Sequence, residues 1–143
     1  MSKIALVRVR GSVNLNGGVK DTLSLLRLYR KNYCVVIEGT PSLMGMIKKV
    51  KDYITYGEID SKIHQEMADK RGEEYLGREE DVKGKIKYNN RFIVIDGRKL
   101  KPFFRLSPPK GGFGRKGIKV SFKSKGALGY RGSEINGLLK RMI

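Results

Sequence analysis

Residues 33–50 read YCVVIEGTPSLMGMIKKV, and this stretch decides the fold of the N-terminal part of the chain. Residues 33–37 form a compact apolar run rich in β-branched side chains, which predicts a buried strand. Thr40 and Pro41 predict the start of a helix, because a Thr side chain caps free N–H groups of the first turn and Pro suits the first helical position. This helix is expected to bury four apolar side chains at helical spacing: Leu43, Ile47, Val50 and Ile54.

The sequence on either side predicts two further strands and a further helix. Residues 3–10 alternate like a strand that is covered at its start and exposed at its end, where Arg8 and Arg10 lie. Residues 19–31 predict a helix with basic side chains on one face, because steps of seven and four residues return to the same side. Residues 55–59 predict a third strand. The order is therefore β-α-β-α-β, which indicates an α+β fold.

Beyond residue 59 the regular signals weaken. Residues 61–71 predict a short helix, capped by Asp60 or Ser61 and followed by a charged surface loop. Apolar positions then alternate around a central Asn-Asn pair within residues 86–94, which indicates a hairpin, and residues 96–97 indicate a further turn.

The last part of the chain combines a basic, Gly-rich segment with a C-terminal helix. In this segment Ile118, Val120 and Phe122 alternate like a strand, which argues against a disordered tail. Ser133 is a candidate cap for the final helix. That helix is expected to bury Ile135, Leu138, Leu139 and Met142.

The charge of the chain indicates a polyanionic partner. Its 143 residues include 31 Lys and Arg against 14 Asp and Glu, a formal net charge of +17, and such an excess is tolerable when nucleic acid or an anionic surface neutralises it. Residues 98–143 carry 13 basic side chains and one acidic one, and residues 1–57 carry 10 and 3. Residues 58–81 reverse the sign, with 4 basic and 9 acidic side chains, so this part is expected to face away from the partner.

Other classes of protein fit the composition less well. No stretch approaches the roughly 18 consecutive apolar residues of a membrane span, and Arg8 breaks the apolar start too early for a signal peptide. Cys34 is the only cysteine, which excludes an internal disulfide and favours a reducing, cytoplasmic location.

Two sets of motifs resemble a known family. The first comprises the strand KIALVRVRG at residues 3–11, LLRL at 25–28 and TPSLMGMIKKV at 40–50. The second comprises FRLSPPKGGF at residues 104–113 and GALGYRG at 126–132. Together they resemble large-subunit ribosomal protein thirty, whose eukaryotic member is numbered seven, and the second set is similar to its longer archaeal form.

The resemblance implies a structure and a function. It implies a three-stranded, mainly antiparallel sheet with two helices on one face, ferredoxin-like in character, at residues 1–59, and an archaeal-type extension at 60–143. It also implies a structural constituent of the large ribosomal subunit, not an enzyme, without cofactor or small-molecule substrate. The implied partners are large-subunit (23S) rRNA, 5S rRNA or its neighbourhood, and neighbouring ribosomal proteins.

Candidate RNA-binding residues come from two regions, because ribosomal proteins bind mostly through phosphate contacts and shape. The N-terminal candidates are Arg8, Arg10, Lys20, Arg27, Arg30 and Lys31, of which Lys20, Arg27 and Lys31 share one face of the predicted helix. The C-terminal candidates are Arg105, Lys110, Arg115, Lys116, Lys119, Lys123, Lys125 and Arg131. Phe113 or Phe122 is a candidate for stacking on a splayed base, the alternative being that both pack on the protein.

Other functions fit the sequence less well. Residues 112–117 match a dinucleotide fingerprint, but they follow two prolines rather than a strand and open no apolar helix. One His and one Cys make a zinc site improbable; His64 is expected to be solvated, and the acidic residues 73–81 to form a solvated face rather than a Mg²⁺ site. A nuclease would need these groups beside the basic residues. A free nucleic-acid-binding regulator stays open as an alternative.

Overall fold

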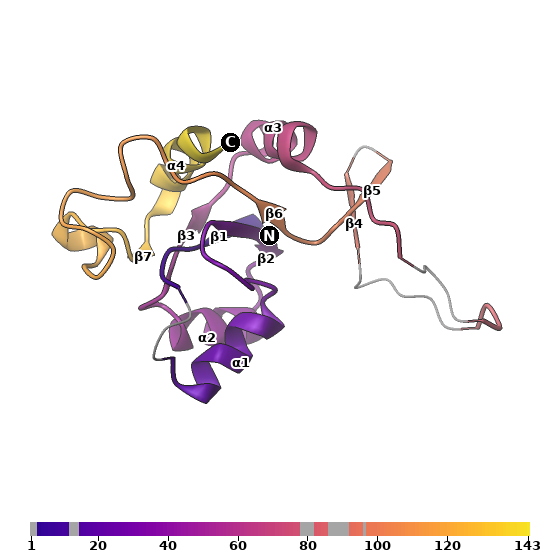
Figure 1. Cartoon of the computed structure of the whole chain (residues 1–143), viewed down its shortest axis with the longest axis horizontal. Helices are drawn as coiled ribbons and strands as arrows, with labels where there is room; N and C mark the ends of the chain where they lie inside the picture. Colours follow the sequence, from indigo (N-terminus) through magenta and orange to yellow (C-terminus); the bar gives the residue numbers. More distant parts are fainter. Residues whose placement is uncertain (1–2, 12–14, 78–81, 86–91, 96) are drawn as a thin grey trace.

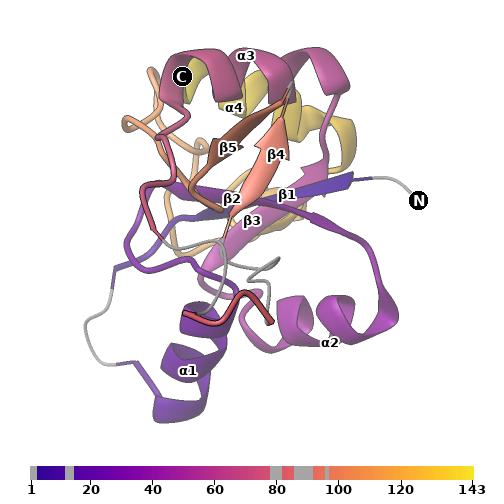
Figure 2. The ribbon, with the colours of Figure 1, turned by 90° about the vertical axis from the view of Figure 1, so that its right-hand side faces the viewer.

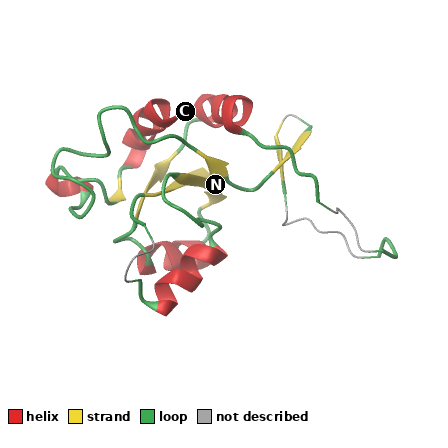
Figure 3. Cartoon of the chain, in the orientation of Figure 1, coloured by secondary structure: helices red, strands yellow, loops and turns green. Residues whose placement is uncertain are grey.

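The computed structural model describes residues 3–11, 15–77, 82–85, 92–95 and 97–143, which form an α+β fold around one mixed sheet (Figures 1 and 3). The helices are α1 (Gly17–Leu25), α2 (Pro41–Lys49), α3 (Ser61–Arg71) and α4 (Ile135–Met142), with short 3-10 turns η1 (Phe122–Ser124) and η2 (Gly132–Glu134). The strands are β1 (Lys3–Arg8), β2 (Tyr33–Glu38), β3 (Ile54–Glu58), β4 (Ile93–Ile95), β5 (Arg98–Leu100), β6 (Phe104–Arg105) and β7 (Gly129–Tyr130). The predicted β-α-β-α-β order is confirmed for residues 3–58.

The main sheet has the strand order β6-β2-β1-β3-β7. Its centre is the expected antiparallel trio, in which Val7 lies opposite Cys34 on β2 and Arg8 lies opposite Ile54 on β3. The extension adds one short strand to each edge: β6 pairs antiparallel with β2, and β7 pairs parallel with β3. The edges of the N-terminal unit are therefore covered by the C-terminal half of the chain.

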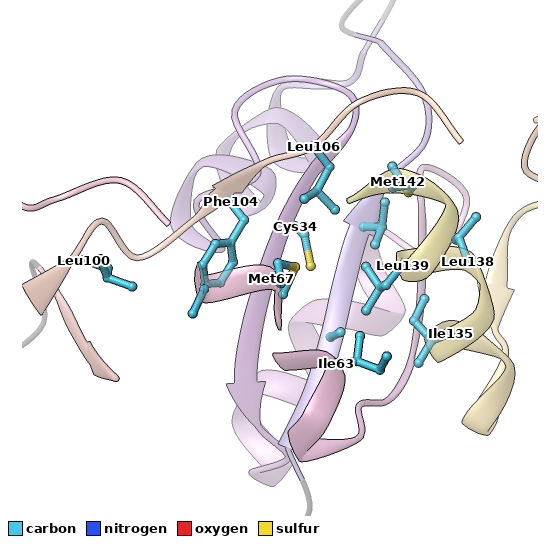
Figure 4. Packing of buried hydrophobic residues seen from close by; sticks show 13 residues of the cluster. Cys34, Ile63, Met67, Leu100, Phe104, Leu106, Ile135, Leu138, Leu139 and Met142 are labelled. Carbon is cyan, nitrogen blue, oxygen red and sulfur yellow. The ribbon is translucent and has the colours of Figure 1, made fainter. Parts of the chain in front are cut away.

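Helices cover both faces of this sheet (Figure 2). The expected pair, α1 and α2, covers one face, where Leu6, Leu23 and Ile47 are buried together. The extension supplies α3 and α4 for the other face, where Cys34 of β2 lies among Met67 of α3 and Leu139 of α4 (Figure 4). The side chains that alternate along β1 are thus apolar on both faces because both faces are buried.

The first helix is shorter than predicted. It begins at Gly17, where the Asn16 side chain accepts a hydrogen bond from the Gly18 N–H, and it ends at Leu25 rather than Lys31. Arg27 adopts a left-handed φ of 64°, its N–H donates to the Ser24 carbonyl, and the Leu28 N–H donates to the Leu23 carbonyl. This pair of bonds is the Schellman arrangement that ends helices, with Arg where Gly is usual.

The other predicted helices are present, with differences at their ends. Thr40 caps α2 and Asp60 caps α3, as predicted. The second helix ends at Lys49, so Ile54 belongs to β3 and not to α2. The final helix buries the four predicted apolar residues, but Ser133 lies within a 3-10 turn and makes no capping bond.

The strand expectations for the extension have different outcomes. A hairpin pairs β4 with β5; the predicted hairpin around Asn89 and Asn90 has its turn outside the described residues and stays a prediction. The predicted strand through Ile118 and Phe122 is wrong, because residues 110–128 form turns and the short η1. Gly114 and Gly126 permit this winding, since a Cβ at either would collide with a backbone carbonyl of the same segment.

Candidate nucleic-acid interface

The cations of the N-terminal half gather at one end of the sheet. At this end β1 finishes, while β2 and β3 begin. The Asn32 N–H donates to the Arg8 carbonyl over 2.7 Å, and the Arg10 N–H donates to the Tyr53 carbonyl over 3.2 Å, so the flanking loops touch. We call this end the cationic end; its elements carry Arg10, Lys20, Arg27, Arg30, Lys31, Lys48, Lys49 and Lys51.

The cationic end is assembled by several elements rather than by one helix face. Because α1 stops at Leu25, the prediction that Lys20, Arg27 and Lys31 share a helix face is wrong. Arg27 and Lys31 lie instead on the turn into β2. The Lys49 ammonium of α2 lies against Gly18 at the start of α1, which joins both helices to this surface. The opposite end of the sheet carries Glu38 and Glu58 together with Lys3, so basic side chains predominate at the cationic end and not at the opposite one.

Arg10 is held in place by its neighbours. Its guanidinium lies over the Tyr53 ring, 5.0 Å from the ring centroid, and its Nη1 donates to the Asp52 carbonyl over 3.4 Å. A cation fixed in this way loses little side-chain entropy when it meets a phosphate. Arg10 is therefore a positioned member of the cationic end.

Arg8 is not exposed as predicted. It is 3% exposed, its Nη1 donates to the Leu28 carbonyl over 2.8 Å, and its Nε donates to the Arg10 carbonyl over 3.0 Å. Burial lowers the pKa of this guanidinium from its ordinary value. The side chain is held against the turn that follows α1, and its role as an RNA-binding residue stays a prediction.

Arg105 is also tied to the protein. It lies on β6 beside Tyr33 and forms an ion pair with Glu73, which also pairs with Lys101 at 3.5 Å. The hydrogen bond from Arg105 is the main cause that lowers the pKa of the Glu73 carboxyl. The expectation of a purely solvated acidic face is thus wrong at Glu73. Its carboxylate joins the chain just after α3 to Lys101 and Arg105, which lie after β5 and on β6.

The basic segment 110–125 forms the second candidate surface. Lys110, Arg115, Lys116, Lys119, Lys123 and Lys125 are all exposed along it. Behind them is a hollow of about 640 Å³ whose lining includes Arg115, Phe122, Lys125 and Arg141. The segment joins the cationic end, because Val9 packs with Ala127 and Leu128 just before β7. The structure therefore brings the two predicted sets of cations to neighbouring surfaces.

The two phenylalanines of this segment differ in their surroundings. Phe113 packs against two buried apolar clusters. This agrees with the alternative to base stacking, in which the ring packs on the protein. Phe122 is half-buried, and the Arg131 guanidinium lies 4.7 Å from its ring centroid. Both rings line the hollow, and Phe122 is the one that has a guanidinium over its face.

Arg131 is structural rather than exposed. It is 7% exposed, and it donates to the Thr55 hydroxyl over 2.7 Å, to the Phe113 carbonyl over 2.6 Å and to the Ala127 carbonyl over 3.0 Å. Burial, together with repulsion from Arg141, lowers its pKa to about 10. Arg131 was predicted as an RNA-binding residue; the structure shows its guanidinium buried, with its donors bonded to the Thr55 hydroxyl and to backbone carbonyls of the extension.

Sequence reasoning missed several cations that the structure places on these surfaces. Lys48, Lys49 and Lys51 lie on α2 and the loop that follows it and were not among the predicted interface residues. Arg141 of α4 donates to the Gly112 carbonyl over 2.7 Å and lines the hollow. Its place in the last turn of an amphipathic helix gave no signal that the basic segment would fold against it.

No alternative site is supported by the described part of the chain. Within it, no group of three or more His, Cys, Asp and Glu could hold a metal ion. His64 is half-buried beside Phe104 rather than solvated; burial, with Lys3 nearby, lowers its pKa. None of the helices described is long and apolar enough to cross a membrane.

A mixed sheet between helices, with cations gathered at one end, defines a basic α+β protein of the nucleic-acid-binding class. A family model described as ribosomal protein L30p/L7e matches residues 4–54. Large ribosomal subunit protein uL30 of Nanoarchaeum equitans is 44% identical over 158 aligned positions that cover 100% of both chains. Those of Methanopyrus kandleri and Methanococcus maripaludis are 40% and 44% identical, covering 94% and 97% of this chain and 100% and 98% of their own.

The chain therefore belongs to the family of large ribosomal subunit protein uL30. The predicted family resemblance is confirmed, and the match extends through the C-terminal half as well as the N-terminal one. Members of this family are structural components of the ribosome and not enzymes.

Proposed function

We propose that this chain is a structural component of the large ribosomal subunit, that it binds 23S rRNA with its cationic end and its basic segment 110–125, and that it helps to anchor 5S rRNA. It works without a cofactor or a small-molecule substrate, beside neighbouring ribosomal proteins in the cytoplasm. Arg10, Lys20, Arg30 and Lys31 contact phosphates from one side, and Arg115, Lys116, Lys119, Lys123 and Lys125 contact them from the other.

The observation that carries the proposal is the meeting of separate basic elements at one end of the sheet. The ends of three antiparallel strands place loops from residues 9–11, 27–32 and 49–53 side by side. The acidic residues of the same strands, Glu38 and Glu58, lie at the far end. A concentration of positive charge at one end of the sheet attracts a phosphate backbone to that end, which is what a fixed place in an RNA particle requires.

Sedimentation tests the location. The chain is tagged in its own host, and the lysate is separated on a sucrose gradient before and after a high-salt wash. A near-stoichiometric amount in washed large subunits supports a component held by shape as well as charge. Complete release into the light fractions would favour a free RNA- or DNA-binding regulator instead.

Charge reversal tests the surface. Lys31→Glu on the cationic end is compared with Lys70→Glu, an exposed lysine that pairs with Glu66 on α3. Binding of the purified full-length chain to transcribed 23S rRNA is measured at several salt concentrations. Lys31→Glu is expected to weaken binding and to lower the slope of log K against log salt by roughly one, whereas Lys70→Glu changes neither. Equal effects of the two variants would refute the proposed surface.

The 5S part of the proposal has its own test. Washed large subunits that carry Lys119→Glu together with Lys123→Glu are analysed for the ratio of 5S to 23S rRNA. Anchoring by the basic segment predicts a reduced ratio relative to unmodified subunits. An unchanged ratio, with the variant chain present in the subunits, would limit the function to 23S rRNA.

A further inference from the structure

Two arginines hold the first residues of the basic segment from one side. Arg141 of α4 donates through its Nη1 to the Lys110 carbonyl over 3.1 Å and to the Gly112 carbonyl over 2.7 Å. Arg131 donates through its Nη2 to the Phe113 carbonyl over 2.6 Å. Three carbonyl oxygens of this loop are therefore already bonded, and all three face a guanidinium group.

The N–H groups of the same peptide units point the other way. The described residues contain no cis peptide bond, and in a trans peptide the N–H of one residue is directed opposite to the carbonyl of the residue before it. The N–H groups of Gly111, Phe113 and Gly114 therefore point away from the two guanidinium groups. In the part of the chain that the structure describes, none of these N–H groups has an acceptor. We call these donors, on the outer side of the loop, the amide row.

Glycines give the loop this shape and leave its outer side open. Gly111 and Gly112 have φ angles of 83° and 81°, a region that side chains rarely allow. No atom lies within 4 Å of the place that a Cβ of Gly112 would take. The glycine spacing of residues 112–117, which matches a dinucleotide fingerprint only in sequence, thus belongs to a loop that presents free N–H groups. Turns of this kind bind anions without a strand before them or a helix after them.

The surroundings of the amide row are positively charged. Lys110, Arg115 and Lys116 are exposed beside it, and none of them forms an ion pair with a described residue. Glu134 is the one acidic residue among the described residues that line the adjoining hollow, and its charge interacts with that of the buried Arg131. The amide row therefore faces outward among cations that are free to meet an anion.

We propose that the amide row binds a phosphate group of the rRNA backbone. A phosphate offers only acceptors, whereas a protein strand would also present N–H groups, and the loop carbonyls that could accept them are already bonded to Arg131 and Arg141. A carboxylate of a neighbouring protein is the rival occupant, but it would leave most of the charge of the three free cations uncompensated. The inference rests on the rRNA binding proposed above and adds to it a contact made by the main chain.

The test removes one N–H group and nothing else from the amide row. Phe113→phenyllactate, introduced by suppression of a stop codon, replaces the N–H by oxygen and keeps the ring. The matched control is Phe103→phenyllactate, because the Phe103 N–H also has no acceptor among the described residues. Both full-length chains are checked by thermal unfolding and titrated against transcribed 23S rRNA at several salt concentrations. The Phe113 variant is expected to raise Kd about 5- to 10-fold with an unchanged salt slope, because a charge-assisted hydrogen bond is lost but no cation, and the Phe103 variant binds like the unmodified chain.

Hydrogen exchange of the unmodified chain gives a second measurement, which is needed because the ester at residue 113 also makes the Gly112 carbonyl a weaker acceptor for Arg141. Exchange of the Gly111 and Gly114 amides is compared in the free chain, on transcribed 23S rRNA and in washed large subunits. A phosphate on the amide row slows both amides about 10-fold or more on the rRNA alone as well as in the subunits. Slowing in the subunits only would assign the site to a protein carboxylate and overturn the proposal.

Each outcome of the titration bears on a different statement. If the unmodified chain fails to bind the rRNA, the proposed function fails before this inference is reached. If the unmodified chain binds and the folded Phe113 variant binds equally well, the amide row holds no phosphate. If the Phe113 and Phe103 variants weaken binding equally, the loss is a general effect of the ester and the site is refuted.

Discussion

Replacing Arg131 by alanine is expected to destabilise the fold rather than to remove an RNA contact. The guanidinium donates to the Thr55 hydroxyl and to the carbonyls of Phe113 and Ala127, and so ties β3 to the basic segment. An acceptor left unsatisfied inside a protein costs about 1–3 kcal/mol. Two effects reduce this cost: water in the adjoining hollow can hydrate part of the site, and the variant no longer has to bury a positive charge. We therefore expect a net loss of about 2–4 kcal/mol, a large share of a typical total.

The assay is urea unfolding of the full-length chain at neutral pH, followed by circular dichroism. Arg115→Ala is the matched control, because Arg115 lines the same hollow but is exposed, and its loss is expected to change stability by less than about 0.5 kcal/mol. In rRNA binding the pattern is reversed: Arg115→Ala lowers the salt slope by roughly one, whereas folded Arg131→Ala does not. A stable Arg131→Ala chain with a reduced salt slope would refute the structural role.

Three further predictions concern stability. Arg27→Gly relieves the left-handed strain and should stabilise the chain by about 0.5–1 kcal/mol in urea unfolding, while its rRNA affinity falls. Because burial, with Lys3 nearby, lowers the pKa of His64 below 6.5, the unfolded state takes up its proton first; unfolding free energy should therefore fall as the pH drops below 6.5, and less so in His64→Gln. Ile47→Asp places a charge where the side chain is 0% exposed and should abolish cooperative unfolding; a folded variant would contradict the packing of α2.

The N-terminal fold could be predicted because its signals are local. A Thr-Pro pair starts α2, and a β-branched run forms β2. Each of these signals determines the structure of only the few residues next to it. The end of α1 could not be predicted in the same way. Leu26 and Leu28 continue the helical apolar pattern, yet both are buried beyond the end of α1, because the chain reverses through Arg27. A non-Gly residue at a helix end leaves no mark in the sequence.

The candidate site was predictable as a composition but not as a set of residues. Arg8 and Arg131 count as cations in any charge analysis, yet both are buried with their guanidinium groups on backbone carbonyls. Their acceptors, Leu28 and Ala127, lie at turns whose positions depend on the tertiary fold. Lys49, in contrast, reaches the cationic end only because α2 packs beside α1.

Ion pairs made by Asp69 of α3 and by Glu73 offset part of the positive charge of the extension. Asp69 pairs with Arg98 at 2.6 Å, and Glu73 pairs with Arg105 and Lys101, so acids from α3 and the residue after its C-cap hold basic residues of β5, of β6 and of the loop between them. These pairs are partly exposed and each adds little stability. They do, however, neutralise three cations that would otherwise add to the mutual repulsion of the basic side chains. The cations left on the surface then lie mainly at the cationic end and on segment 110–125. The internal ion pairs thereby leave the positive electrostatic potential concentrated on the surfaces where a phosphate backbone is proposed to bind.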